Sequence, residues 1–175
     1  MTVANMITVL RVILVPIFVI YMINERILAS LVIFCIASLS DAADGFIARV
    51  FHQKSNLGAH LDPLADKILL TTAYIILAVF KMIPPWLAVL IISRDVIILL
   101  GVLVFYLTHY PVTIHPSILS KATTCIQLAT VLMVLSSGYI DIPFLNPYLF
   151  WAAGLMTIAS GLQYIRIGLI ILNKQ

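Results

Sequence analysis

The chain has 175 residues, of which 63% are hydrophobic and only 10% are charged, and its mean hydropathy is +1.16. A soluble domain of this size needs more polar residues to cover its surface, so the composition excludes an ordinary soluble enzyme and predicts an integral membrane protein. The net charge of +3 comes without any cluster of four or more basic residues, which leaves nucleic-acid binding without support.

Apolar runs that are long enough to cross a bilayer, roughly 20 residues each, recur along the whole chain. Six such runs lie near residues 4–23, 27–50, 58–80, 84–108, 119–138 and 145–172. The connections between them are short and contain no linker. The sequence therefore predicts an all-α membrane protein, with six transmembrane helices in a single bundle and a single domain over residues 1–175.

The first run carries three polar residues, Asn5, Thr8 and Arg11, at successive spacings of three. Residues three apart are neighbours on a helix surface, so we expect these side chains to share one face. Two interpretations of Arg11 are open. It contacts an anionic ligand, or it anchors the helix by extending its guanidinium to the headgroup level.

The second and third runs contain four of the seven acidic residues of the chain, namely Asp41, Asp44, Asp62 and Asp66. Ionisable groups at membrane depth are costly unless they are paired, hydrated or bound to a metal. Spacings of three and four place each pair on one side of its helix, and the short polar connection FHQKSN makes the two helices antiparallel neighbours. We therefore expect the two carboxylate pairs to converge.

Four converging carboxylates repel one another and stay ionised only beside a compensating cation. Hard oxygen donors, with no His or Cys on either stripe, favour Mg²⁺ or Mn²⁺, or Ca²⁺ in a loose site. Four of them suggest two ions, an arrangement that clamps phosphoryl oxygens during displacement. Gly45 and Ala48 remove bulk where a ligand approaches the helix, and Arg49 can hold a phosphate through two parallel hydrogen bonds.

Two other interpretations of the acidic hairpin are weaker. A set of structural salt bridges would need an equal number of bases, and only Arg49 and Lys67 are close in sequence. A divalent-cation transporter or channel is an alternative from a different functional class. Such proteins usually distribute their acids over several broken helices, whereas these acids are concentrated on one hairpin.

Further polar residues lie in the fourth and fifth runs. In the fourth, LIISRDVIILL contains Ser93, Arg94 and Asp95; in the fifth, Lys121, Thr124 and Gln127 are expected on one face. Arg94 and Lys121 can form an anion pocket, or Arg94 and Asp95 can neutralise each other.

The acidic hairpin fits the pattern D-x2-D-G-x2-A-R-x8-G-x3-D-x3-D at all eight fixed positions between residues 41 and 66. This pattern is similar to the signature of the CDP-alcohol phosphatidyltransferases, and NMITVLRVILVP resembles the first helix of that family. The resemblance implies an enzyme, usually a homodimer, that transfers a phosphatidyl group from CDP-diacylglycerol to an alcohol and releases CMP.

The resemblance also implies roles for individual residues. Two divalent metal ions, Mg²⁺ or Mn²⁺, are assigned to Asp41, Asp44, Asp62 and Asp66, and Asp66 is also the catalytic base that deprotonates the acceptor hydroxyl. The expected donor-binding residues are Asn5, Thr8, Gly45, Ala48, Arg49 and Gly58. The anion pocket of Arg94 and Lys121 becomes the expected binding site of the acceptor.

The acceptor itself is predicted from the fourth and fifth runs. IISRDV followed by SKATTCIQL resembles the cardiolipin synthases of the family, whose acceptor is phosphatidylglycerol. Phosphatidylglycerophosphate synthases, which use glycerol 3-phosphate, look like ARE with a second arginine eight positions after the first, where this chain has Val102. Phosphatidylglycerol is the favoured acceptor, and glycerol 3-phosphate is the alternative.

Basic residues predict the orientation in the membrane, because Lys and Arg favour the cytoplasmic side. With the N-terminus inside, Lys54, Lys121 and Lys174 fall near the cytoplasmic face, and Arg26 and Lys81 fall on the other side. We expect a multi-pass protein of a bacterial inner membrane, with an active site that faces the cytoplasm.

Overall fold

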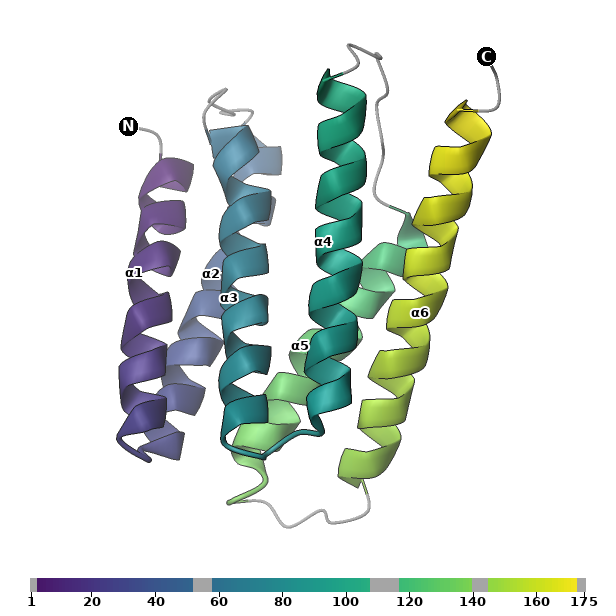
Figure 1. Cartoon of the computed structure of the whole chain (residues 1–175). Helices are drawn as coiled ribbons and strands as arrows, with labels where there is room; N and C mark the ends of the chain where they lie inside the picture. Colours follow the sequence, from purple (N-terminus) through teal and green to yellow (C-terminus); the bar gives the residue numbers. More distant parts are fainter. Residues whose placement is uncertain (1–2, 52–57, 108–116, 140–144, 173–175) are drawn as a thin grey trace. The chain divides into compact units, whose positions relative to one another are not determined.

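The computed structural model describes residues 3–51, 58–107, 117–139 and 145–172 (Figure 1). Within these residues it contains six helices and no strand. Every predicted helix is confirmed, with boundaries within two residues of the expected ones. The helices are α1 (Val3–Ile23), α2 (Ile27–Phe51), α3 (Gly58–Val79), α4 (Pro85–Leu107), α5 (Ile118–Ser136) and α6 (Leu145–Leu172).

The apolar length of the helices bears on the membrane prediction. Among the described residues, one helix is long and apolar enough to cross a bilayer, namely α5, with 19 residues and a mean hydropathy of 1.7. Shorter apolar stretches are Leu10–Ile23, Ile27–Ser40 and Lys67–Val79. The all-α class is confirmed for the described part of the chain, and the number of membrane spans stays a prediction. Lys54 and Lys174, on which the predicted orientation depends, lie outside the described residues.

The helices belong to two compact units. The first unit comprises Met1–Met82 and Val131–Asp141, and therefore holds α1, α2 and α3. The second comprises Ile83–Thr130 and Ile142–Gln175, and holds α4, α6 and the first part of α5.

In the first unit, α1 packs against both α2 and α3. The rings of Phe18 on α1 and Phe34 on α2 meet with centroids 5.8 Å apart. From Leu10 onward, where the side chains of α1 are described, the buried residues recur at spacings of three and four, as expected for one face of a helix. They are Arg11, Val15, Phe18 and Met22.

Two turns in the first unit end their helices in the same way. The N–H of Arg26 donates to the carbonyl of Tyr21 after α1, and the N–H of Met82 donates to the carbonyl of Leu77 after α3. The residues before these donors, Glu25 and Lys81, have φ values of 57° and 58°. This left-handed conformation at a helix end satisfies carbonyls that the helix leaves free, and it reverses the chain direction sharply.

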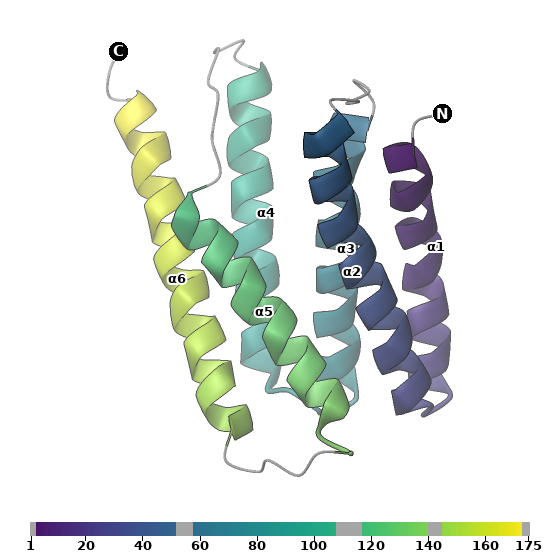
Figure 2. The same ribbon diagram turned by 180° about the vertical axis from the view of Figure 1, so that it is seen from behind.

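In the second unit, α4 packs against α6, and the first half of α5 is inclined across them in the view from behind (Figure 2). Trp86 of α4 and Trp151 of α6 lie with ring centroids 5.3 Å apart. Gly154 lies beside this pair, because a Cβ atom on it would come within 2.9 Å of Cζ3 of Trp86. The missing side chain thus allows α4 and α6 to approach closely, as small residues do between membrane helices.

We predict that Gly154→Ala destabilises the protein, because the new methyl group must displace a rigid indole ring that contacts Trp151. Overpacking of this kind typically costs about 1–3 kcal/mol, which corresponds to a decrease of several degrees in the thermal unfolding midpoint measured in detergent.

The matched control is Gly168→Ala on the same helix, where a Cβ atom meets nothing within 4 Å. It should be neutral or raise the midpoint, because alanine favours a helix over glycine by about 1 kcal/mol. Equal stabilisation by both substitutions would show that Trp86 moves aside freely.

Candidate active site

The four motif aspartates belong to α2 and α3 of the first unit, toward the ends of these helices that are consecutive in the chain. Asp41 and Asp44 belong to the C-terminal turns of α2, and Asp62 and Asp66 belong to the N-terminal turns of α3. Both helices therefore carry the carboxylates near the same end of the hairpin. The side chains at these four positions lie outside the described part of the structure.

The other residues that were expected to bind the donor also belong to helices of the first unit. Gly45, Ala48 and Arg49 follow on α2, Gly58 is the first residue of α3, and Asn5 and Thr8 belong to the first turns of α1. All three helices belong to one compact unit. Their side chains are likewise not described, so the expected donor contacts stay predictions.

The buried face of α2 leads directly into the acidic positions. Ser30, Phe34 and Ala37 are fully buried, at spacings of four and three. The next positions of this helical stripe are 41, 44 and 48, which are Asp41, Asp44 and Ala48. Positions 41 and 44 therefore continue, along the backbone of α2, the stripe that is buried at Ser30, Phe34 and Ala37.

The buried face of α3 leads to the other pair. Leu70, Ala73 and Leu77 are buried on α3. Counting back from Leu70 in steps of four gives Asp66 and Asp62. All four motif positions thus continue stripes that are buried further along α2 and α3, and the convergence of the carboxylates stays a prediction.

Arg11 is fully buried, and it is the largest side chain of the described residues to be so. A residue that anchors a helix by reaching the headgroup level keeps its guanidinium accessible. Full burial does not fit that interpretation of Arg11. It favours a role for the charge inside the first unit.

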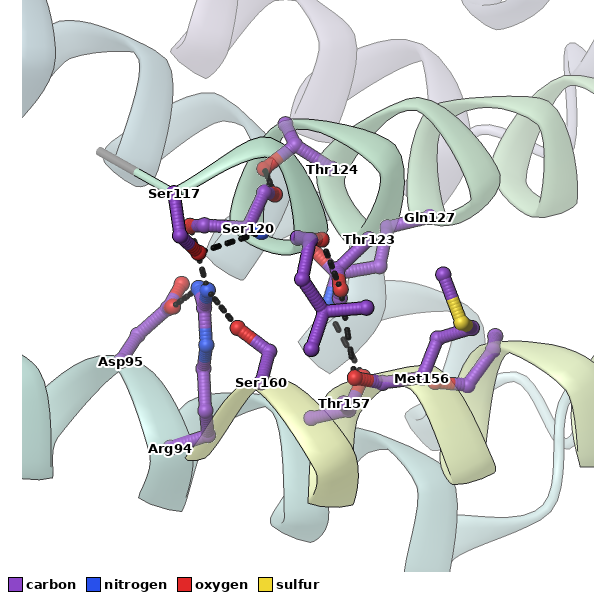
Figure 3. A network of polar contacts seen from close by, with 12 residues as sticks. Arg94, Asp95, Ser117, Ser120, Thr123, Thr124, Gln127, Met156, Thr157 and Ser160 are labelled. Carbon is purple, nitrogen blue, oxygen red and sulfur yellow. Dashed lines mark hydrogen bonds and ion pairs between the residues drawn. The ribbon is translucent and has the colours of Figure 1, made fainter. Parts of the chain in front are cut away.

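A second polar site is built around Arg94 of α4 (Figure 3). Its Nη1 lies 2.6 Å from Oδ1 of Asp95, and its Nη2 donates to Oγ of Ser120 at 2.8 Å and to Oγ of Ser160 at 2.7 Å. Arg94 is 4% exposed and Asp95 is 5% exposed. One arginine therefore joins α4, α5 and α6 inside the second unit, and its Nε makes no hydrogen bond to any described residue.

Hydroxyl groups extend this site along α5 and α6. Ser117 accepts from the N–H of Ser120 at 3.1 Å, which caps the start of α5, and donates to Oε1 of Gln163 at 2.9 Å. Further along, Nε2 of Gln127 donates to Oγ1 of Thr157 at 3.1 Å. Such bonds hold helices together where the surroundings are apolar.

The three polar residues that we expected on one face of α5 have different surroundings in the structure. Gln127 is fully buried and points to α6, Lys121 is exposed, and Thr124 donates to the carbonyl of Ser120 within its own helix. Arg94 is paired with Asp95, as one of the two interpretations anticipated. The acceptor-binding role of Arg94 and Lys121 stays a prediction.

Sequence reasoning missed Ser120 and Ser160, which bind Arg94 at the meeting of α5 and α6. A partial signal was present, because Thr123, Gln127 and Thr130 recur at spacings of four and three and are all buried. This polar stripe marks the face of α5 that packs against α6, as the contacts of Thr123 and Gln127 show. The positions of Lys121 and Thr124 do not mark that face.

Comparisons with known proteins agree with the acidic motif. Residues 1–159 match the family model described as CDP-alcohol phosphatidyltransferase. The chain is 35% identical over 179 residues to the CDP-diacylglycerol–glycerol-3-phosphate 3-phosphatidyltransferase of Bacillus subtilis (strain 168), covering 91% of each protein.

Relatives named for a different acceptor are about equally similar. The cardiolipin synthase (CMP-forming) of Homo sapiens is 34% identical over 189 residues, which cover 95% of this chain and 62% of that protein. The probable cardiolipin synthase (CMP-forming) of Drosophila melanogaster is 32% identical, over 94% of this chain and 57% of that protein.

The chain thus spans about three fifths of these animal relatives and nine tenths of the bacterial one. The match over residues 1–159 confirms the family and the class of enzyme predicted from the acidic motif, and the chain belongs to the CDP-alcohol phosphatidyltransferase family.

Proposed function

We propose that this protein transfers the phosphatidyl group of CDP-diacylglycerol to phosphatidylglycerol and releases CMP, which makes it a cardiolipin synthase. The observation that carries the proposal is the complete eight-residue motif, set on the helix ends of one compact unit. Membership in the family argues against the alternative of a divalent-cation transporter or channel.

The four aspartates suit two divalent cations. All are hard oxygen donors, and their positions continue the helical stripes that are buried further along α2 and α3, a register in which an uncompensated carboxylate would be costly. No other group of three or more His, Cys, Asp or Glu side chains that could hold a metal occurs among the described residues. Asp41, Asp44, Asp62 and Asp66 would hold two Mg²⁺ or Mn²⁺ ions, which when bound neutralise the donor diphosphate and the leaving CMP.

The residues of the chain supply the positioning and the proton transfer. Asp66 takes the proton of the acceptor hydroxyl. The freed oxygen attacks the phosphorus that carries the diacylglycerol, and the bond from that phosphorus to the bridging oxygen breaks, so that CMP leaves with the bond electrons. Contacts from Asn5, Thr8, Gly45, Ala48, Arg49 and Gly58 hold the donor in line for this displacement.

The charge around Arg94 favours phosphatidylglycerol as the acceptor. Asp95 neutralises part of the Arg94 charge at 2.6 Å, so the exposed Lys121, which follows Ser120 in the chain, is the base that can meet an incoming anion. A phosphodiester has one negative charge, whereas glycerol 3-phosphate has two and needs more compensation in an apolar setting. Val102 stands where the related phosphatidylglycerophosphate synthases look to have another arginine.

Glycerol 3-phosphate is the second candidate acceptor. The Bacillus subtilis relative, whose name gives that acceptor, is 35% identical and matches over almost its whole length. With this acceptor the same two-metal site would form phosphatidylglycerophosphate, so the choice of acceptor does not alter the proposed mechanism.

The proposed setting is a bacterial inner membrane, with six membrane-spanning helices, a homodimer, and an active site on the cytoplasmic side. The apolar length of α5 is compatible with membrane insertion. Apolar side chains that are exposed on the other helices support it as well, because lipid would cover them. Examples are Val89 and Leu100 on α4 and Leu155 and Leu162 on α6.

The first prediction concerns the metal. Treatment with EDTA should abolish CMP release from CDP-diacylglycerol, and Mg²⁺ or Mn²⁺ should restore it, because the diphosphate has no other charge compensation of that size at the motif. Undiminished turnover in metal-free buffer would contradict the two-metal site. Ion flux into liposomes without any lipid product would instead support a transporter.

The second prediction concerns Asp66. Asp66→Asn keeps the shape of the side chain but removes its basicity, so kcat should fall by roughly 10²–10⁴-fold or more. The control is Glu25→Gln, which neutralises an acid in the exposed turn after α1 and should leave kcat unchanged. A turnover of Asp66→Asn close to that of the control would assign the base to another residue.

The third prediction concerns the product. Purified protein with CDP-diacylglycerol should form cardiolipin from phosphatidylglycerol and release CMP much more slowly with glycerol 3-phosphate, as measured by thin-layer analysis of the lipids. Formation of phosphatidylglycerophosphate without cardiolipin would show that glycerol 3-phosphate is the acceptor, and it would leave the proposed mechanism intact.

A further inference from the structure

Arg11 places a full positive charge inside the first unit. Its side chain is 0% exposed, and an arginine stays protonated in a protein even when it is buried. Removing a charge from water is costly unless an opposite charge lies close to it. The neighbours of α1 are α2 and α3, the two helices that carry the four motif aspartates.

The contact between Phe18 and Phe34 fixes how α1 and α2 are aligned. The two helices are antiparallel (Figure 1), and these rings lie 5.8 Å apart. Arg11 is seven residues before Phe18, and Asp41 is seven residues after Phe34. Seven residues are about two turns, or roughly 10 Å, so positions 11 and 41 lie at the same level and on the two contacting faces.

The third helix brings Asp66 to a similar level. α1 and α3 run in the same direction, and their C-terminal ends lie at the same height in Figure 1. Arg11 is 12 residues before the last residue of α1, and Asp66 is 13 residues before the last residue of α3. The backbone therefore places a buried arginine within about one helical turn of the level of one aspartate from each pair.

We propose that Arg11 is the built-in counter-charge of the four-aspartate site. It is a positioning residue that offsets the repulsion among the carboxylates when no divalent cation is bound. The same positive charge opposes the binding of cations to the site. This inference rests on the proposed function, because it takes the four aspartates as the metal site.

The first test compares thermal unfolding midpoints of the full-length protein in EDTA and in saturating Mg²⁺. Arg11→Met should be destabilised mainly in EDTA, so its Mg²⁺-induced increase in midpoint should exceed that of the wild type by about 4 °C or more. The matched control is Arg94→Met, which removes the other arginine that is buried among the described side chains and belongs to the second unit. It should lower both midpoints alike and keep the wild-type increase.

The second test measures Mn²⁺ binding from the electron paramagnetic resonance signal of the free ion. Loss of the positive charge should make Arg11→Met bind Mn²⁺ roughly five- to tenfold more tightly than the wild type. Arg11→Lys, which keeps the charge, should stay near the wild-type affinity. Unchanged affinity and an unchanged Mg²⁺-induced increase in Arg11→Met would overturn the inference and leave Arg11 as a packing residue.

The remaining outcomes are also decisive. If Arg11→Met folds only when Mg²⁺ is present, the inference is supported. If it folds in neither condition, the double variant Arg11→Met/Asp41→Asn removes one charge of each sign, and its failure to regain folded protein would contradict the inference. A wild-type protein that binds no Mn²⁺ would instead refute the proposed metal site, which separates the two failures.

Discussion

Burial of charge among apolar helices is the constraint on which the rest of the structure depends. The chain has few charged residues, and several of them occupy faces that its helices bury. Such groups are tolerated only with compensation. In the second unit Arg94 obtains it from Asp95 and two serine hydroxyls. In the first unit we propose that the motif aspartates obtain it from divalent cations and from the buried charge of Arg11.

The two units thus meet the same physical demand in different ways. The Arg94 site obtains its hydrogen bonds within the chain, apart from Nε, and it ties three helices together, so the observed contacts serve packing. At the aspartate positions the proposed compensation comes from Arg11 and from two divalent cations. Such a site suits a donor with a diphosphate, because the bound cations also offset the negative charge of that group.

The sequence predicted the helices well, because each apolar run is long and is separated from the next by a short break that contains polar residues or prolines. It also predicted the family, because all eight fixed positions of the signature are present at the right spacing. It did not predict the partners of Arg94. Ser120 and Ser160 are 26 and 66 residues away, and only the packing of helices brings them together. Helix packing also explains why Lys121, Thr124 and Gln127 do not share one environment: Gln127 faces α6 and is buried, whereas Lys121 is exposed.

The most direct test of the two-metal account is anomalous diffraction at the manganese edge from crystals grown with Mn²⁺ and a CDP-linked donor. The account predicts two peaks about 3.5–4 Å apart, surrounded by Asp41, Asp44, Asp62 and Asp66, with the donor diphosphate bound between them. A single peak at another position, or a donor bound without manganese at these aspartates, would contradict it.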